Sequence, residues 1–272
     1  MIAIELERKL RSLRLSGVVE ALPVRLAEAT HNDLAHLEFL ELLVQDELTR
    51  RRERLLSRRL KAAQLPAHSS LDSFEWSFNP TIPKALILDL ATLRFIVERG
   101  GALVMGPAGV GKTHICCAIA VRAIEAGYCA LYRSAFDLAE DLAEAAATGT
   151  RKELIGRLSS VDLLILEDLG GRRLPPTAGE DLLEVMSRRY ERGATILTSN
   201  RPIEDFGAIL GDAVAAGVLL DRFLHHAEVV TLTGKSYRLH ERARRRDLLT
   251  PPSANTVPAS VSASGAPPTT PQ

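Results

Sequence analysis

The first 64 residues carry the pattern of amphipathic helices. Leucine and valine recur at three- and four-residue steps between Leu34 and Leu48, which places them along one side of a helix. No glycine follows Gly17 in this stretch, and Pro23 is its one proline. These features predict a small all-α module that contains one long helix.

The helical period stops in residues 65–83, where prolines and small polar residues surround Phe74, Trp76 and Phe78. This composition is typical of a linker, and we expect its aromatic side chains to dock on a neighbouring surface. The pattern therefore predicts a domain boundary near residue 75, with a helical domain over residues 1–75.

From residue 101 onward, short apolar runs alternate with helical stretches. The runs are residues 102–105, 128–132, 163–166, 195–197 and 229–232. This alternation is typical of an α/β fold in which a parallel sheet is joined by helical crossovers. We expect such a domain over residues 76–249. Residues 250–272 carry no charge and are mostly Pro, Ser, Thr and Ala, which predicts a disordered tail.

Composition narrows the class of protein. Of the 272 residues, 46% are hydrophobic and 25% are charged, as in ordinary folded proteins, and the 34 basic residues balance the 34 acidic ones. No apolar run approaches the roughly 18 residues of a membrane span, and charge in the first turns argues against a signal peptide. The three cysteines, of which Cys116 and Cys117 are adjacent, match no bridge or metal site, so we interpret them as small buried side chains. We expect a cytoplasmic protein with no membrane partner.

Residues 106–113 match the phosphate-loop pattern G-x-x-x-x-G-K-[ST] at every fixed position, between a predicted strand and a predicted helix. In such a loop, glycines allow successive N–H groups to face anionic oxygens, and the helix N-terminus adds its positive end. Lys112 would contact the β- and γ-phosphates of ATP, and Thr113 would give its hydroxyl to Mg²⁺. The residues expected to bind the nucleotide are Gly106, Pro107, Ala108, Gly109, Val110, Gly111, Lys112, Thr113 and His114.

Two adjacent carboxylates, Glu167 and Asp168, follow the apolar run at residues 163–166. One carboxylate at the end of a buried strand can hold Mg²⁺ while its neighbour polarises a water molecule for attack on the γ-phosphate. The usual order is Asp for the metal and Glu for the base, and here it is reversed. We expect Glu167 to hold the metal together with Thr113, and Asp168 to act on the water; two solvated acids in a turn are the alternative.

Asn200 ends a further predicted strand, at the same edge of the sheet as the phosphate loop. Its amide could position the attacking water or contact the γ-phosphate. An asparagine before Arg201 and Pro202 is equally typical of a turn.

Five motifs have a characteristic order and spacing. They are residues 106–113, 163–170, 198–200, 221–223 and 234–238. In this arrangement they resemble the IstB/DnaC-like AAA+ ATPases over about residues 74–246. Residues 13–17 and 78–80 resemble IstB, the helper ATPase of an insertion-sequence transposase, more than the helicase loader DnaC.

This resemblance implies a three-layer P-loop AAA+ domain that binds ATP and Mg²⁺ and assembles into an ATP-dependent oligomer. It implies that Arg222 reaches the γ-phosphate of a neighbouring subunit as an arginine finger. Arg238 resembles the sensor-2 arginine and Asn200 the sensor-1 residue. Without the resemblance, Arg222 beside Asp221 is typical of a charge on the surface of a helix.

Charge is separated along the predicted long helix, because residues 20–47 hold seven acidic residues against Arg25 and residues 50–61 hold seven basic residues against Glu53. The basic residues are Arg50, Arg51, Arg52, Arg54, Arg58, Arg59 and Lys61. They could contact phosphates of double-stranded DNA with little sequence preference, since no base-reading module is evident. They could also form a solvated face or pair with the acidic half of another subunit's helix. The resemblance to IstB favours DNA binding over these two alternatives.

Three functions are compatible with these motifs. The leading hypothesis is a DNA-binding ATPase that selects target DNA and activates a cognate transposase. A DnaC-like helicase loader would have the same nucleotide site, but its partner would be a helicase instead of a transposase. A small-molecule kinase would need an acceptor pocket and mobile lid arginines, whereas this sequence has paired carboxylates and a separate basic module.

Overall fold

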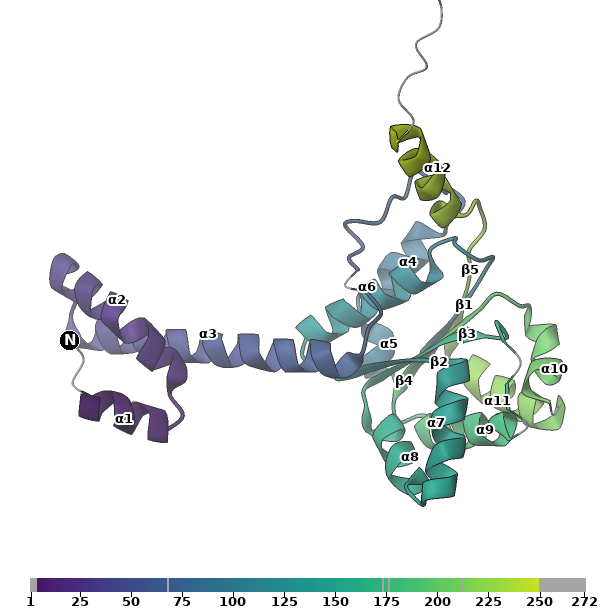
Figure 1. Ribbon diagram of the computed structural model, residues 1–272, viewed down its shortest axis with the longest axis horizontal. Coiled ribbons are helices and arrows are strands. Elements are labelled where there is room, and N and C mark those ends of the chain that lie inside the picture. The colour runs from purple at the N-terminus through teal and green to yellow at the C-terminus, as the bar shows by residue number, and fades with distance from the viewer. Residues whose placement is uncertain (1–3, 68, 173, 176, 212, 250–272) are drawn as a thin grey trace, which may run out of the picture.

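A five-stranded parallel sheet forms the centre of the protein, in the strand order β2-β3-β4-β1-β5 (Figure 1). The computed structural model describes residues 4–67, 69–172, 174–175, 177–211 and 213–249. The strands are β1 (Gly101–Met105), β2 (Ala130–Ser134), β3 (Leu163–Leu169), β4 (Ala194–Ser199) and β5 (Ala227–Thr231). The predicted α/β fold class is confirmed. The tail at residues 250–272 lies outside the described residues.

Both faces of the sheet are covered by helices, which gives three layers. In β1, Ala102 and Val104 point to one face and Leu103 to the other, because successive side chains of a strand alternate. The first face packs against α4 (Lys84–Leu90), α5 (Arg94–Val97) and α6 (Lys112–Glu125). The second packs against α7 (Ala135–Thr148), α8 (Arg151–Ser160), α9 (Ala178–Arg189), α10 (Phe206–Leu210) and α11 (Ala213–Leu224), with the short helix η1 (Ile203–Asp205) preceding α10.

This double burial explains why the strands are continuous apolar runs in the sequence. Each predicted run overlaps one strand, and β3 continues beyond its run through Glu167, Asp168 and Leu169. Cys116 and Cys117 are buried in α6, as expected, but Cys129 is exposed and the interpretation of that residue as a buried side chain is wrong. None of the described helices is long and apolar enough to cross a membrane.

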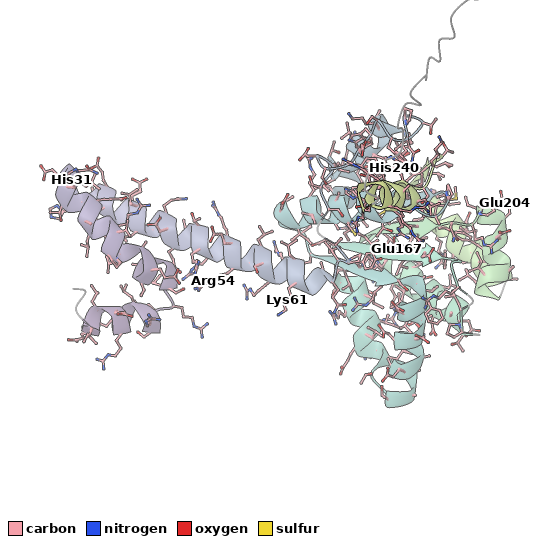
Figure 2. All side chains as sticks on the ribbon, turned by 45° about the horizontal axis from the view of Figure 1, so that its top comes forward. His31, Arg54, Lys61, Glu167, Glu204 and His240 are labelled. Carbon is pink, nitrogen blue, oxygen red and sulfur yellow. The ribbon has the colours of Figure 1, made fainter. Side chains whose placement is uncertain are left out.

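The N-terminal residues form a helical arm, residues 4–63, that stands away from the sheet (Figure 1, Figure 2). It consists of α1 (Ile4–Ser12), α2 (Ser16–Asn32) and the long helix α3 (His36–Ala63). The hydrophobic cluster of the arm is small: its buried residues are Val18, Leu22 and Leu43, and Leu10, Leu15 and Phe39 pack against them. The last turns of α3, including Leu56 and Leu60, pack on the core of the sheet domain instead.

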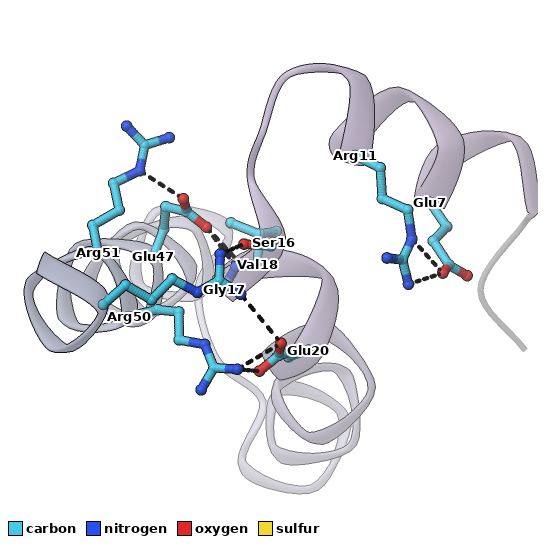
Figure 3. Close-up of polar contacts among 10 residues, drawn as sticks. Glu7, Arg11, Ser16, Gly17, Val18, Glu20, Glu47, Arg50 and Arg51 are labelled. Atoms are coloured by element: carbon cyan, nitrogen blue, oxygen red, sulfur yellow. Dashed lines mark hydrogen bonds and ion pairs between the residues drawn. The ribbon is translucent and has the colours of Figure 1, made fainter. Parts of the chain in front are cut away.

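One buried carboxylate ties α2 to α3 (Figure 3). Glu47 accepts hydrogen bonds from the N–H groups of Gly17, at 2.6 Å, and Val18, at 3.2 Å, and Arg51 donates to its other oxygen at 2.7 Å. Burial raises the pKa of Glu47, but the hydrogen bonds from Arg51, Val18 and Gly17 outweigh it and leave the pKa below its usual value. Gly17 is required there because a Cβ would lie 2.8 Å from the Cα of Glu47.

Candidate nucleotide-binding site

The phosphate loop joins the carboxyl end of β1 to α6, and its shape depends on glycine. Gly106, Gly109 and Gly111 have φ angles of 152°, 81° and 113°, a region that other residues rarely adopt. A Cβ at Gly106 would collide with the carbonyl of Leu232, and one at Gly109 would collide with the Ser236 hydroxyl. The loop is therefore held both by its own backbone and by the chain that follows β5.

Lys112 is folded into the mouth of this loop. Its ammonium donates to the carbonyl of Gly106 at 2.7 Å and to that of Pro107 at 3.0 Å. Burial lowers the pKa of Lys112, and the charges of Asp168 and Glu167 oppose that shift. A cation whose partners in the described part of the chain are two carbonyls, and which lies beside a cavity, can transfer its hydrogen bonds to phosphate oxygens at little cost.

The carboxylate of Glu167 is held from two sides. The Thr113 hydroxyl donates to one oxygen, and the Tyr132 hydroxyl, from the end of β2, donates to the other. Burial raises the pKa of Glu167, the hydrogen bond from Thr113 lowers it, and the charge of Asp168 raises it again, with a net increase. The group is thus fixed in place between the first turn of α6 and the sheet.

Asp168 reaches the same cavity through an irregularity in β3. Adjacent side chains of a regular strand point to opposite faces, but Asp168 has φ 61° and the pairing with β4 shifts register between Leu166 and Leu169. The N–H of Asp168 donates to the Thr198 hydroxyl at 2.9 Å. As a result, Glu167 and Asp168 both line one cavity.

That cavity has a volume of about 360 Å³. It is lined by residues 108–114 of the loop and α6, the two carboxylates, Thr198, Asn200 and the exposed Arg238. His114 also lines it, with one ring nitrogen 2.9 Å from the carbonyl of Ser70. The structure therefore brings together most of the nucleotide-site residues predicted from the sequence.

The far wall comes from two segments that are distant in sequence. Asn79 donates to the carbonyl of Lys235 at 3.0 Å and accepts from its N–H at 2.9 Å. Next to this pair, Tyr237 begins α12 (Tyr237–Leu249) and its ring lies edge-on to Phe78, with centroids 5.1 Å apart. The N–H of Tyr237 donates to the carbonyl of Gly109 at 2.9 Å. The wall is thus bonded directly to the tip of the phosphate loop.

Several of these residues were not predicted as part of the site. Phe74 and Phe78 were expected to dock on a neighbouring surface, and that surface proves to be the cavity. Tyr132 carried no sequence signal of its own, since a tyrosine near the end of a strand is common. Tyr237 lies in the motif at residues 234–238 but was given no role there. Only the tertiary contacts reveal their positions.

Arg222 lies apart from this cavity. It lines a separate hollow with Gly100, Gly101 and Thr195, which stand at the amino ends of β1 and β4, the edge of the sheet opposite the phosphate loop. Its guanidinium donates to the Ser187 hydroxyl at 2.7 Å and is exposed. The structure does not bring Arg222 to the phosphate loop of its own chain.

The seven basic residues of α3 divide into two groups. Arg50 pairs with Glu20 at 2.8 Å and Arg51 with Glu47 (Figure 3). Arg54 contacts Ser16 and Glu20. The other four make no ion pair within the part of the chain that the structure describes: Arg52, Arg58, Arg59 and Lys61. Arg54 and Lys61 project from the same side of α3 (Figure 2).

The fold and the site together define the class of protein to which this chain belongs. A parallel sheet of this order, with a phosphate loop after β1 and acidic residues at the end of β3, is that of a P-loop AAA+ protein. The solved structure of DnaI has a similar fold, with a TM-score of 0.52 at 22% identity. The match covers 61% of this chain and 91% of that one. AMPPCP-bound DnaA from Aquifex aeolicus gives a TM-score of 0.54 at 21% identity, over 69% of this chain and 58% of that chain.

The chain belongs to the family of IstB-like ATP binding proteins, whose sequence model matches residues 8–245. It is 34% identical to the putative ATP-binding protein of insertion sequence IS21 from Pseudomonas aeruginosa, over 94% of this chain and 95% of that protein. It is 35% identical to the putative ATP-binding protein of insertion sequence IS5376 from Geobacillus stearothermophilus, over 79% of this chain and 85% of that one. The resemblance to IstB seen in the sequence is confirmed.

Proposed function

We propose that this protein is the ATP-dependent, DNA-binding helper of an insertion-sequence transposase. The observation that carries the proposal is the cavity in which the phosphate loop, Glu167 and Asp168 meet. The family and its ATP-binding relatives from insertion sequences support both the ligand and the biological setting. In this proposal the protein selects target DNA, assembles with ATP and activates its cognate transposase.

The donor set fits a nucleotide with Mg²⁺. The glycine loop leaves room for phosphates, Lys112 supplies a cation, and the Thr113 hydroxyl and Glu167 carboxylate supply the hard oxygens that Mg²⁺ prefers. No cluster of three or more His, Cys, Asp or Glu occurs among the described residues, which is compatible with an ion held by one or two side chains, phosphate oxygens and water. The ion would neutralise charge on the β- and γ-phosphates.

Hydrolysis then needs a water molecule placed in line with the γ-phosphate. Asp168 accepts a proton from this water, and the Asn200 amide orients it. The water oxygen bonds to the γ-phosphorus as the bond to the leaving oxygen of ADP breaks, which yields ADP and phosphate. Arg238, which lines the cavity, stabilises the charge of the phosphates.

Arg222 acts on the nucleotide of a neighbouring subunit in this proposal. Its exposure and its position at the edge of the sheet opposite the phosphate loop support a role in trans, because Arg222 does not reach the nucleotide cavity of its own chain. The Ser187 hydroxyl holds its guanidinium in a fixed direction. An oligomer assembled with ATP would complete each site at the contact between two subunits.

Double-stranded DNA is the proposed ligand of the basic half of α3. Its support is the row of cations, of which Arg52, Arg58 and Lys61 are exposed and make no ion pair within the described ranges. Contacts to phosphates alone would give binding with little sequence preference and a strong dependence on salt.

Particle imaging with an ATP analogue and unrelated DNA duplexes tests these parts together. We expect ordered oligomers on each duplex only when both ligands are present. Monomers under every condition would contradict the assembly, and equal assembly without nucleotide would contradict its dependence on ATP. Adding the cognate transposase or a replicative helicase then separates the two candidate partners, because only the true partner should change the ATPase rate.

A further inference from the structure

Tyr132 lies next to Glu167 in the sheet but outside the nucleotide cavity. It pairs in register with Ile165 of β3, while Ser134 pairs with Glu167. Because side chains alternate along a strand, Tyr132, Ile165 and Glu167 point to the same face of the sheet. Thr113 and Glu167 line the cavity, and Tyr132 is not among its described lining residues. Any effect of Tyr132 on the nucleotide site therefore passes through Glu167.

The hydrogen bond from Tyr132 to Glu167 does not come from the residue directly beside the glutamate. That residue is Ser134, whose hydroxyl accepts from the N–H of Asp137 at 3.1 Å and so caps α7. The donor is instead the diagonal neighbour Tyr132, because an aromatic side chain is long enough to reach a diagonal position. The Tyr132 ring packs on the core between the sheet and α6, and this packing directs its hydroxyl toward the carboxylate.

Two hydroxyls hold a side chain that is longer than the usual aspartate at this place. Glutamate has one more methylene group than aspartate and therefore one more torsion angle to fix. Thr113 donates to one carboxylate oxygen and Tyr132 donates to the other. Hydrogen bonds to a charged acceptor are strong, so the two together fix both the position and the plane of the carboxylate.

We propose that Tyr132 is a positioning residue that gives the Glu167 carboxylate its preference for Mg²⁺ over Ca²⁺. The inference rests on the proposed nucleotide and Mg²⁺ site. Mg²⁺ requires nearly ideal octahedral geometry, whereas Ca²⁺ accepts variable geometry and carboxylates that bind through one or both oxygens. A carboxylate held at both oxygens presents one fixed direction, which suits Mg²⁺ better than Ca²⁺. Without the Tyr132 hydroxyl, Glu167 is free to turn and this preference decreases.

Tyr132→Phe tests the proposal, because it removes the hydroxyl and keeps the ring on the core. The probe is a fluorescent, non-hydrolysable ATP analogue, whose binding is titrated with magnesium chloride and, separately, with calcium chloride. The magnesium concentration for half-maximal binding should rise about 10–100-fold, as for the loss of other groups that orient a metal ligand. The calcium midpoint should change by less than about threefold, because Ca²⁺ tolerates a turned carboxylate.

Tyr128→Phe is the matched control. The Tyr128 ring is also partly buried against the same core, and its hydroxyl makes no hydrogen bond within the part of the chain that the structure describes. This variant should leave both midpoints unchanged. Thermal melting in EDTA compares the folding of both variants with that of the wild type, and nucleotide binding in EDTA should be the same for all three.

A merely structural role of Tyr132 predicts a different result. It would shift the magnesium and calcium midpoints equally, or weaken nucleotide binding in EDTA, and either outcome would overturn the proposal.

A Glu167→Asp background tests whether Tyr132 acts through the longer carboxylate. The aspartate carboxylate is withdrawn by about one bond length, 1.5 Å, which breaks a hydrogen bond to the Tyr132 hydroxyl. Adding Tyr132→Phe to this background should therefore change the magnesium midpoint by less than about twofold, since two residues that act as a unit are not additive. The full loss in this background would show that Tyr132 acts by another route and would overturn the proposal.

Failure of this inference is distinguishable from failure of the proposed function. A wild-type chain that binds no nucleotide at any magnesium concentration would contradict the proposed site, and the role of Tyr132 with it. Wild-type binding that depends on magnesium, together with Tyr132→Phe titrations identical to the wild type, would overturn the role of Tyr132 alone.

Discussion

The nucleotide cavity and the helical arm are constructed in opposite ways. The cavity joins segments far apart in the chain, as in the pair of hydrogen bonds between Asn79 and Lys235. Lys112, Thr113 and Glu167 in it are wholly or partly buried. Apart from the last turns of α3, which pack on the sheet domain, the arm is held by contacts within the first 63 residues, such as Glu47 with Gly17. Most of its charges are exposed.

This difference predicts different responses to mutation. In the cavity a few groups share one network, so the loss of one should abolish a step of the chemistry. On the arm, similar exposed charges act in parallel, so each should contribute a small part of DNA binding. Substitutions in the two regions test this contrast, beginning with the largest expected effect.

Lys112→Ala should lower kcat/KM for ATP by more than about a thousandfold, because it removes the cation that contacts the β- and γ-phosphates. The fold should survive, since among the described residues the hydrogen-bond partners of this lysine are two loop carbonyls. Nucleotide titration and ATPase assays measure the effect, with thermal melting as the check on folding. Unchanged ATP affinity would contradict the phosphate-loop assignment.

Arg222→Ala should bind ATP almost normally but hydrolyse it about a thousandfold more slowly, as for other arginine fingers. Mixing it with Lys112→Ala should restore some activity, because an intact phosphate loop on one chain then meets an intact Arg222 on the other. The readout is the ATPase rate across mixing ratios. No recovery in mixed oligomers that are shown to form would argue against action in trans.

Glu167→Gln and Asp168→Asn should have separable effects. The first should weaken Mg²⁺-dependent nucleotide binding, because it weakens an oxygen held beside Thr113. The second should leave binding and lower kcat by about a hundredfold or more, as loss of a general base does. Nucleotide titrations over a range of Mg²⁺ concentrations distinguish the two. The assignment is reversed if only Asp168→Asn weakens Mg²⁺-dependent binding.

Arg58→Glu combined with Lys61→Glu should weaken binding to unrelated duplexes equally. The plot of log affinity against log salt should become shallower by about one unit for each DNA phosphate that the variant no longer neutralises. These residues are preferable to Arg50 and Arg51, whose ion pairs also stabilise the arm. Lys152→Glu, at an exposed residue of α8, makes the same lysine-to-glutamate change away from α3, with half the change in net charge, and should leave DNA affinity almost unchanged. If the control loses affinity equally, the loss does not come from α3, and the DNA-binding surface lies elsewhere.

Glu47→Gln should reduce the local stability of the arm by about 1–3 kcal/mol, because it weakens the bonds to Gly17 and Val18. The pKa of Glu47 is lowered in the folded protein, so its contribution is present above the usual glutamate pKa of about 4.3 and is lost as the pH falls below it. Hydrogen exchange of α2 amides at several pH values measures this. Exposed Glu53 offers the control Glu53→Gln, and ATPase activity at neutral pH should be unaffected.

The sequence alone determined the features that depend on neighbours along the chain. The five strands were visible because parallel strands covered on both faces need continuous apolar runs. The phosphate loop was visible because its glycines and Lys112 must stand at fixed spacing between a strand and a helix. The helical arm was visible because its apolar residues repeat with the period of a helix.

Tertiary structure decided what depends on distant segments or on local departures from regular geometry. The irregular backbone at Asp168 turns both carboxylates into one cavity, which the alternation of a regular strand would forbid. Tyr132 meets Glu167, and Asn79 meets Lys235, only because the chain folds those elements together. Periodicity could place Leu37 and Val44 on one face of a helix, but whether α2 covers that face depends on the angle at which two helices pack, and no pattern within either helix specifies it.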